Sequence, residues 1–383
     1  MGPRAVPLSA RALHLHLLSL SQFSVLPSLS RAQNSPRKAT QCFYRFASMS
    51  SVFTPTSTSA IKRQPLPKGL QLKSSLDKCY VIDEVLSERS AAGRIWCVYR
   101  ATHEGKQFIL KDIIPGDFNY IISLQKHVEH SPRVRTAVDS IPERHMFIFP
   151  YLEKGLLHVD TGALSSVAKK AIIRNALAGL ADLHDEHIIH TDIKPTNIMM
   201  DSFKQQNGDL EWGNVQITDL EAAVILPPKA KGLTDRLSGN HFWRSPEAWA
   251  RGIQNTPSDI YSFAVVAIFA WTGNMVFFSD KANRASPEEQ AELILSRHLS
   301  FFASNEEDFE GFIAYHGGED NPFVERIKEL CKTFTEENPR LPFKRWQQVD
   351  PQFRDLVCKM TCLDPLRRIT ARKALQHPWF AAE

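Results

Sequence analysis

The stretch that decides the fold is residues 190–197, which read HTDIKPTN and lie between two apolar runs. The spacing suits phosphoryl transfer, because Asp192 can accept a hydroxyl proton and Lys194 can neutralise a phosphoryl group in transit. The amide oxygen of Asn197 can hold a divalent ion against phosphate oxygens. A lone H-x-D is a weak signal, since Asp often serves as a turn residue. Eight positions in register predict a catalytic loop.

The H-x-D-x-K-P-x-N pattern resembles the catalytic loop of eukaryotic protein kinases, and its Lys194-Pro195 pair resembles the serine/threonine branch. At a position where many kinases carry arginine, this sequence has Thr191. In the family that arginine grips a phosphorylated activation loop, and without a guanidinium the bidentate contact is lost. We therefore expect activity that does not depend on activation-loop phosphorylation.

The composition is that of an ordinary soluble protein, with 383 residues, 43% apolar and 23% charged. Residues 1–76 contain ten of the 46 basic residues and none of the 42 acidic ones, so residues 77–383 carry 36 basic and 42 acidic side chains. The net charge of +4 therefore belongs to the leader, and nothing in the rest indicates a nucleic-acid surface. No apolar run is long enough to span a bilayer.

Residues 1–76 form a leader rich in Ser, Arg, Pro and Ala, a composition typical of a mitochondrial transit peptide. Two alternatives stay open, namely a disordered tail without an address and translation that begins at Met49. We therefore expect an intracellular protein that is cytoplasmic or mitochondrial.

The six cysteines include no CxxC pair, and Cys358 and Cys362 stand one helical turn apart. This spacing favours structural thiols in a reducing compartment over a metal site or a disulfide.

The small lobe begins with two predicted strands, residues 80–86 and 95–101, joined by a turn of small residues. They resemble the hairpin that covers ATP in protein kinases. Of the three glycines in the family motif only Gly93 is present, and we expect Gly93 and Val98 to contact the nucleotide.

The apolar strand 108–111 ends in Lys111 and resembles the kinase V-A-I-K motif, whose lysine contacts the α- and β-phosphates. That lysine normally pairs with a glutamate on the next helix. Here the helix is expected over 117–130, and Ile121 falls at the glutamate position. Either another acid replaces the glutamate, or Lys111 is held by phosphate alone.

A buried strand at 146–149 is followed by P-Y-L-E at 150–153, which resembles the hinge between the kinase lobes. The resemblance implies that the backbone around Tyr151 and Leu152 binds adenine. It places the small lobe at 77–152 and the large lobe at 153–383.

Helical periodicity over 165–184 predicts a long helix in the large lobe. One face of this helix is expected to carry Val167, Ile172, Ala176, Leu180 and Leu183. The polar insert 201–214 ends in Gly-Asn and predicts an exposed hairpin loop.

The strand 215–217 leads to Asp219-Leu220-Glu221, which resembles the D-F-G motif of kinases. The resemblance implies that Asp219 chelates Mg²⁺ together with Asn197. Glu221 replaces the glycine of the motif, and loss of this flexible pivot predicts a less mobile loop.

The segment 239–247, GNHFWRSPE, resembles the kinase segment that ends in A-P-E. The resemblance implies a buried ion pair between Glu247 and Arg368, and hydrogen bonds from Asp259 to the backbone of the catalytic loop. In their particular residues, these motifs resemble those of a divergent group of kinase-like proteins of filamentous fungi.

The resemblance covers roughly residues 80–380 and implies an α+β, bilobal kinase fold, with a small β-rich lobe carrying one helix and a larger, mainly helical lobe. It implies transfer of the γ-phosphoryl group of ATP to a Ser or Thr hydroxyl of a protein, with Mg²⁺ as cofactor. Asp192 and Lys194 would be catalytic, Asn197 and Asp219 would bind the metal, and Lys111 would anchor the nucleotide. We expect a monomer without a membrane span or a nucleic-acid partner.

Two other interpretations of the function stay open. A pseudokinase that binds nucleotide without phosphotransfer is favoured by the degenerate glycine loop and the missing helix glutamate. A small-molecule kinase shares H-x-D-x-x-x-x-N, although the S-P-E segment, Arg368 and the H-P-W-F ending favour a protein kinase.

Overall fold

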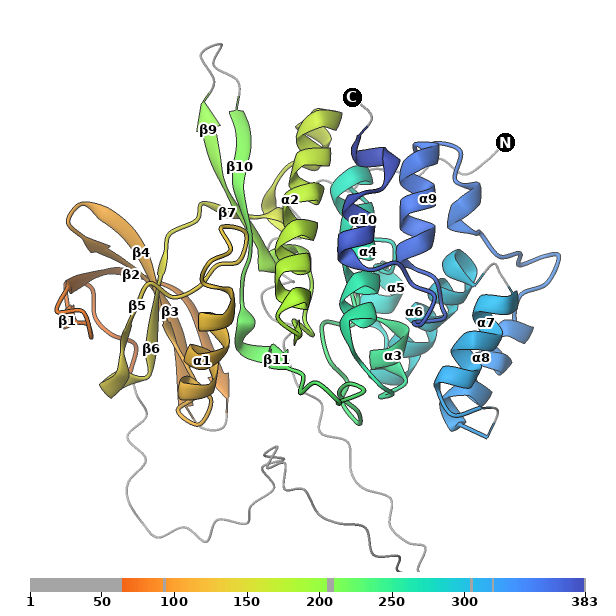
Figure 1. Ribbon diagram of the computed structural model, residues 1–383, viewed down its shortest axis with the longest axis horizontal. Helices are drawn as coiled ribbons and strands as arrows, with labels where there is room; N and C mark the ends of the chain where they lie inside the picture. Colours follow the sequence, from red (N-terminus) through yellow and green to blue (C-terminus); the bar gives the residue numbers. More distant parts are fainter. Residues whose placement is uncertain (1–63, 92–93, 205–209, 304–305, 319, 382–383) are drawn as a thin grey trace, which may run out of the picture. The chain divides into compact units, whose positions relative to one another are not determined.

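The fold is described from a computed structural model, which covers residues 64–91, 94–204, 210–303, 306–318 and 320–381 (Figure 1). Residues 61–383 form one compact unit. The expected leader lies largely outside the described residues, and so does Gly93, which was expected to contact the nucleotide.

The first part of the unit is an antiparallel sheet of six strands in the order β1-β2-β3-β4-β6-β5. The strands are β1 (Gln71–Lys73), β2 (Cys79–Ala91), β3 (Arg94–His103), β4 (Lys106–Asp112), β5 (Asp139–Ile141) and β6 (Met146–Pro150). The sheet starts before residue 77, where the small lobe was expected to begin. Strand β1 pairs with β2, and Ser74 and Ser75 donate hydrogen bonds to the carboxylate of Asp139.

Alternating side chains bury one face of this sheet, as the two-residue period of a strand requires. Tyr80 and Ile82 of β2 pack with Tyr99 and Ala101 of β3 and with Leu110 of β4. The register places Val98 of β3 opposite Lys111 of β4, so the lysine occupies the central part of the sheet rather than a fraying edge.

Helix α1 (Phe118–Val128) is the one α-helix that follows within this lobe, and it is shorter than the expected 117–130. Its buried residues recur at the helical spacing, and Phe118 stacks on Phe147 of β6 with ring centroids 4.7 Å apart. Ile121 is buried in the same apolar cluster. The helix ends before Ser131-Pro132, because the residue preceding a proline disfavours the helical backbone.

The insert 201–214 was expected to be an exposed hairpin loop; it does form a hairpin, but most of its described residues are strand rather than loop. Strands β9 (Ile198–Lys204) and β10 (Leu210–Ile217) form an antiparallel hairpin, and β9 also pairs with β7 (Lys154–Gly155). The Gly213-Asn214 pair, taken as a loop signal, lies at a register shift inside β10, where Asn214 has a φ of 49°. Gly and Asn there accommodate a β-bulge, which the sequence cannot distinguish from a turn.

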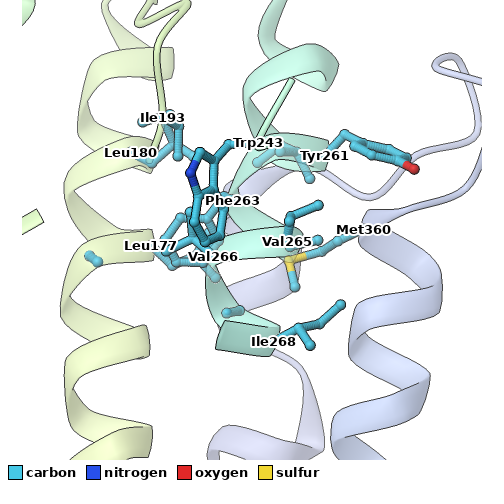
Figure 2. Close-up of a cluster of buried hydrophobic side chains, with 14 of the residues drawn as sticks. Leu177, Leu180, Ile193, Trp243, Tyr261, Phe263, Val265, Val266, Ile268 and Met360 are labelled. Atoms are coloured by element: carbon cyan, nitrogen blue, oxygen red, sulfur yellow. The ribbon is translucent and has the colours of Figure 1, made fainter. Parts of the chain in front are cut away.

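The large lobe is built around two helices, α2 (Ser166–Asp185) and α4 (Thr256–Thr272). Figure 2 shows Leu177 and Leu180 of α2 meeting Phe263 and Val266 of α4 in the main core. The side chains of α4 are buried almost all round, which explains its continuous apolar sequence. Val167 was expected on the buried face of α2, but it is 70% exposed because it lies in the first turn, beyond the contact with the core.

Shorter helices complete this lobe around α4 (Figure 1). They are α3 (Pro246–Trp249), α5 (Asp280–Arg284), α6 (Pro287–Phe302), α7 (Glu306–Tyr315), α8 (Pro322–Lys332), α9 (Pro351–Met360) and α10 (Ala371–Leu375). A two-stranded sheet pairs β8 (Ile188–Ile189) with β11 (Val224–Ile225). The cysteines in the described ranges are free thiols, including Cys358 and Cys362.

Glu247 at the start of α3 and Arg368 form the expected buried ion pair. Arg368 donates two hydrogen bonds to the Glu247 carboxylate, at 2.8 and 2.9 Å, and both side chains are fully buried. Ser258 adds a third donor at 2.9 Å. Burial alone would raise the pKa of Glu247, but the Arg368 guanidinium holds it below its ordinary value. The pair joins segments 121 residues apart.

We expect Arg368→Met to lower the free energy of unfolding by about 3–5 kcal/mol, because it leaves the Glu247 carboxylate buried without its cation. Denaturant titration measures this change. The adjacent Arg367 pairs with Glu307 at 2.8 Å on the exposed surface, so Arg367→Met is the matched control and is expected to change the midpoint little. Equal effects of the two substitutions would show that burial of the pair is unimportant.

Candidate active site

The catalytic loop is held in place by the carboxylate of Asp259, near the N-terminus of α4. It accepts hydrogen bonds from the backbone N–H groups of His190 at 2.7 Å and Thr191 at 2.9 Å. Its third contact is with the ring of His184, at 3.1 Å. Thr191 has a φ of 68°, a left-handed conformation that is unfavourable for a β-branched residue. The buried Asp259 offsets this strain, because the loop cannot relax without losing two charge-assisted hydrogen bonds.

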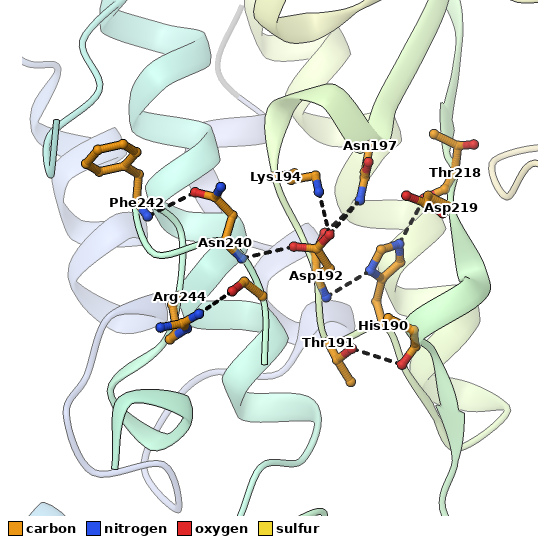
Figure 3. A network of polar contacts seen from close by, with 12 residues as sticks. His190, Thr191, Asp192, Lys194, Asn197, Thr218, Asp219, Asn240, Phe242 and Arg244 are labelled. Carbon is orange, nitrogen blue, oxygen red and sulfur yellow. Dashed lines mark hydrogen bonds and ion pairs between the residues drawn. The ribbon is translucent and has the colours of Figure 1, made fainter. Parts of the chain in front are cut away.

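Asp192 lies at the centre of a polar network (Figure 3). Its Oδ2 atom is 2.5 Å from Lys194 Nζ, and its Oδ1 atom accepts a hydrogen bond from the backbone N–H of Asn240 at 3.1 Å. The side-chain amide of Asn197 donates to the backbone carbonyl of Asp192 at 2.9 Å. The expected catalytic pair and one expected metal ligand are therefore in direct contact.

His190 connects this loop to the end of β10. Its Nε2 atom lies 3.0 Å from the carbonyl oxygen of Thr218, which can only accept, so Nε2 carries the proton. Its Nδ1 atom then accepts from the backbone N–H of Asp192 at 3.3 Å. The Thr218 N–H donates to the Asn197 carbonyl at 2.9 Å. These bonds fix the backbone immediately before Asp219 beside Asn197.

Lys111 reaches across from the six-stranded sheet to this network. Its Nζ atom lies 2.8 Å from Asp219 Oδ1 and 2.5 Å from Glu221 Oε1, and the lysine side chain is 25% exposed. Burial lowers the pKa of Lys111, but the two carboxylates more than offset burial and keep it protonated. Lys111 in turn holds the pKa of Asp219 well below its ordinary value despite burial. Burial and the Asp219 charge raise the pKa of Glu221.

The expected adenine-binding residues lie at the end of β6. Tyr151 is half-buried and donates its backbone N–H to the Gln107 carbonyl at 3.3 Å, while the Leu152 side chain is buried. Arg135, not anticipated from the sequence, donates from Nε to the Pro150 carbonyl at 3.1 Å and lies over the ring of Phe149. It tethers the start of the hinge segment to residues beyond α1.

The geometry can be compared with known proteins. A family model of the protein kinase domain matches residues 109–380, well over half of the chain. The chain belongs to the protein kinase domain family.

The chain is also similar to individual proteins that are described as kinases. Over 145 residues, which is 35% of the chain, it is 30% identical to an Arabidopsis thaliana protein described as "Probable receptor-like serine/threonine-protein kinase", and the match covers 31% of that protein. The chain thus spans about a third of that curated relative's length. A chain of the yeast RNA Pol II CTD kinase CTDK-1 complex is similar with a TM-score of 0.57 at 20% identity, covering 75% of this chain and 90% of that chain. At this identity the likeness concerns the fold.

The kinase domain contains site residues that motif reasoning missed. Asn240 contacts Asp192, and Arg244 donates to the carbonyls of Ser238 at 2.8 Å and Gly239 at 2.6 Å. Gly239 has a φ of +76°, and a Cβ there would lie 2.9 Å from the Thr191 carbonyl oxygen. The glycine in GNHFWRSPE was the available signal, since it permits this close approach to the catalytic loop.

Uncharged contacts hold the start of the activation segment, which comprises residues 219–247. Thr191 Oγ1 donates to the Ala222 carbonyl at 3.0 Å, and the Ile225 N–H donates to Tyr120 Oη of α1 at 3.0 Å. The Leu226 N–H donates to the His187 carbonyl at 2.9 Å. Thr191, at the usual arginine position, therefore bonds this segment directly. No helix in the described ranges is long and apolar enough to cross a membrane.

Proposed function

We propose that this kinase domain is an active serine/threonine protein kinase that uses ATP and Mg²⁺. The observation that carries the proposal is one connected set of contacts that joins Asp192, Lys194 and Asn197 to Asp219 and Lys111. These are the groups that phosphoryl transfer requires. The side chains come from β4, the catalytic loop and the end of β10, so the fold converges on this site from separate parts of the sequence.

Asp192 is suited to orient a substrate hydroxyl and accept its proton. Its Oδ1 atom is positioned by the Asn240 N–H, and Lys194 Nζ lies against Oδ2, where it can also reach a transferred phosphoryl group. The contacts fix the carboxylate before substrate arrives, which reduces the reorganisation needed during transfer.

Asn197 and Asp219 fit a magnesium ion. They offer an amide oxygen and a carboxylate, which are hard oxygen ligands of the kind Mg²⁺ prefers alongside phosphate oxygens. Asn197 uses its Nδ2 atom on Asp192, which leaves its Oδ1 atom for a cation. When bound, Mg²⁺ would neutralise charge on the nucleotide phosphates. The ionised state of Asp219, maintained by Lys111, suits this role.

Exposed positive charge on the activation segment supports acidic peptide substrates. Four exposed cations of the activation segment and the loop after α3 make no ion pair or side-chain hydrogen bond within the described ranges, namely Lys229, Lys231, Arg236 and Arg251. Backbone bonds from Leu233 to Gln254 and from Asp235 to Arg251, both 2.8 Å, bring these two segments side by side. Asp235 is the one acidic residue in 227–245.

Mg·ATP phosphotransfer by the full chain tests the proposal, with autophosphorylation and protein substrates as readouts and Asp192→Asn as the matched variant. We expect label incorporation by the natural chain and its loss in the variant, because asparagine cannot accept the hydroxyl proton. Absence of incorporation, with ATP still raising the melting temperature, would establish a pseudokinase instead. Phosphorylation of a simple alcohol or amine but of no protein would indicate a small-molecule kinase.

A serine flanked by glutamates is expected to be phosphorylated with a kcat/KM at least about fivefold higher than the same peptide flanked by lysines, since several exposed pairs add small increments. Lys231→Glu with Arg236→Glu should remove the preference. Lys106→Glu, at the exposed start of β4, serves as the charge-matched control. Equal or better use of the lysine peptide by the natural chain would contradict the assignment, as would insensitivity of the preference to ionic strength.

A further inference from the structure

The acid that pairs with Lys111 comes from an unexpected part of the chain. Helix α1 contains no Asp or Glu, and Ile121, at the position expected for the glutamate, is 2% exposed among Ile113, Phe118 and Phe147. The carboxylates on Lys111 are those of Asp219 and Glu221, two residues apart in the activation segment. Glu221 makes the shorter contact of the two.

The backbone on both sides of Glu221 is fixed, so its carboxylate is aimed at Lys111 by the fold. Asp219 has a φ of 69°, which turns the chain into the 3₁₀ turn Leu220–Ala222. Leu220 on one side is 4% exposed within the main core. On the other side, the Ala222 carbonyl accepts the hydrogen bond from Thr191. A flexible glycine at position 221 would supply neither the charge nor this rigidity.

Two acids on one lysine allow a division of roles. In the proposed function, Asp219 binds the metal and Lys111 contacts the nucleotide phosphates. If Asp219 were the sole partner, a cation that engaged Asp219 would leave the lysine without a counter-ion to position it. Glu221 can stay on Lys111 at that point, because its contact is separate from that of Asp219. Arg89 on β2 is a further positive charge that acts on Glu221.

We propose that Glu221 is the positioning residue for Lys111, replacing an acid on α1, so that the lysine is aligned from the activation segment. The inference rests on the proposed function, but measurements of nucleotide binding alone are enough to test it. It implies that a displacement of α1 does not itself carry an acid away from Lys111. Regulation by a partner that moves α1 would then have no ion pair to break or form.

A double-mutant cycle on the full chain tests whether Glu221 acts through Lys111. The variants are Glu221→Gln, Lys111→Met and the two combined, and the readout is the Kd of Mg·ATP, with melting temperatures to confirm folding. We expect Glu221→Gln to weaken binding about tenfold, since it removes a partly buried charge partner. The double variant should bind no more weakly than Lys111→Met, because the glutamate has no lysine left to position.

Two further variants complete the design. Glu129→Gln, the acidic position nearest the end of α1, is the control and should leave the Kd unchanged. Glu221→Asp keeps the charge and should recover part of the affinity, which a purely structural role for the side chain would not predict. If Glu221→Gln is unstable, Glu221→Asp replaces it in the same cycle with Lys111→Met, and the Kd of Mg·ATP remains the readout.

Each outcome bears on the inference. Additive effects of the two substitutions, or unchanged binding in Glu221→Gln, would overturn it even if the chain is an active kinase. Non-additive binding in a chain that transfers no phosphate would support the inference while the proposed function fails. Absence of Mg·ATP binding by the natural chain would overturn both.

Discussion

The ammonium group of Lys111 is the constraint on which the site depends. A charge at this depth must be paired, because removal from water without a partner is costly. Its partners, Asp219 and Glu221, lie more than a hundred residues further along the chain. Pairing the lysine therefore requires the six-stranded sheet to meet the end of β10, which places the two sides of the proposed nucleotide site against each other. The site and the junction between the lobes share one set of contacts.

Two other buried carboxylates connect distant segments of the large lobe in the same way. Asp259 connects the N-terminus of α4 to the strained backbone of the catalytic loop, and Glu247 connects α3 to Arg368. In each case a charged group that would be costly if unpaired specifies a contact between distant segments. The apolar core stabilises the fold but does not specify which polar groups meet. These charged contacts help to determine which backbone groups lie beside Asp192. The geometry around Asp192 is thus fixed by buried ion pairs and hydrogen bonds of the large lobe.

Much of this could be predicted from the sequence, because the relevant signals are local patterns. HTDIKPTN and the strand ending in Lys111 were recognisable from residue order, whereas the pairing of Glu247 with Arg368 was implied by the resemblance to protein kinases. The extent of the strands in the β9–β10 hairpin was not recognisable, since Gly213-Asn214 suits a turn and a bulge equally well. Val167 matched the helical period, but periodicity does not show where a helix extends beyond its neighbours. Glu221 could be seen only as a lost glycine, because its contact with Lys111 depends on the left-handed backbone at Asp219.

In the proposed arrangement, Glu221 of the activation segment holds Lys111 while Asp219 binds a metal ion. A crystal structure of the chain with Mg²⁺ and a non-hydrolysable ATP analogue tests this most directly. We expect Glu221 to remain about 3 Å from Lys111 Nζ, with Asp219 turned to the metal and the lysine also contacting phosphate. A structure in which Glu221 points to solvent and Lys111 contacts phosphate alone would contradict the claim.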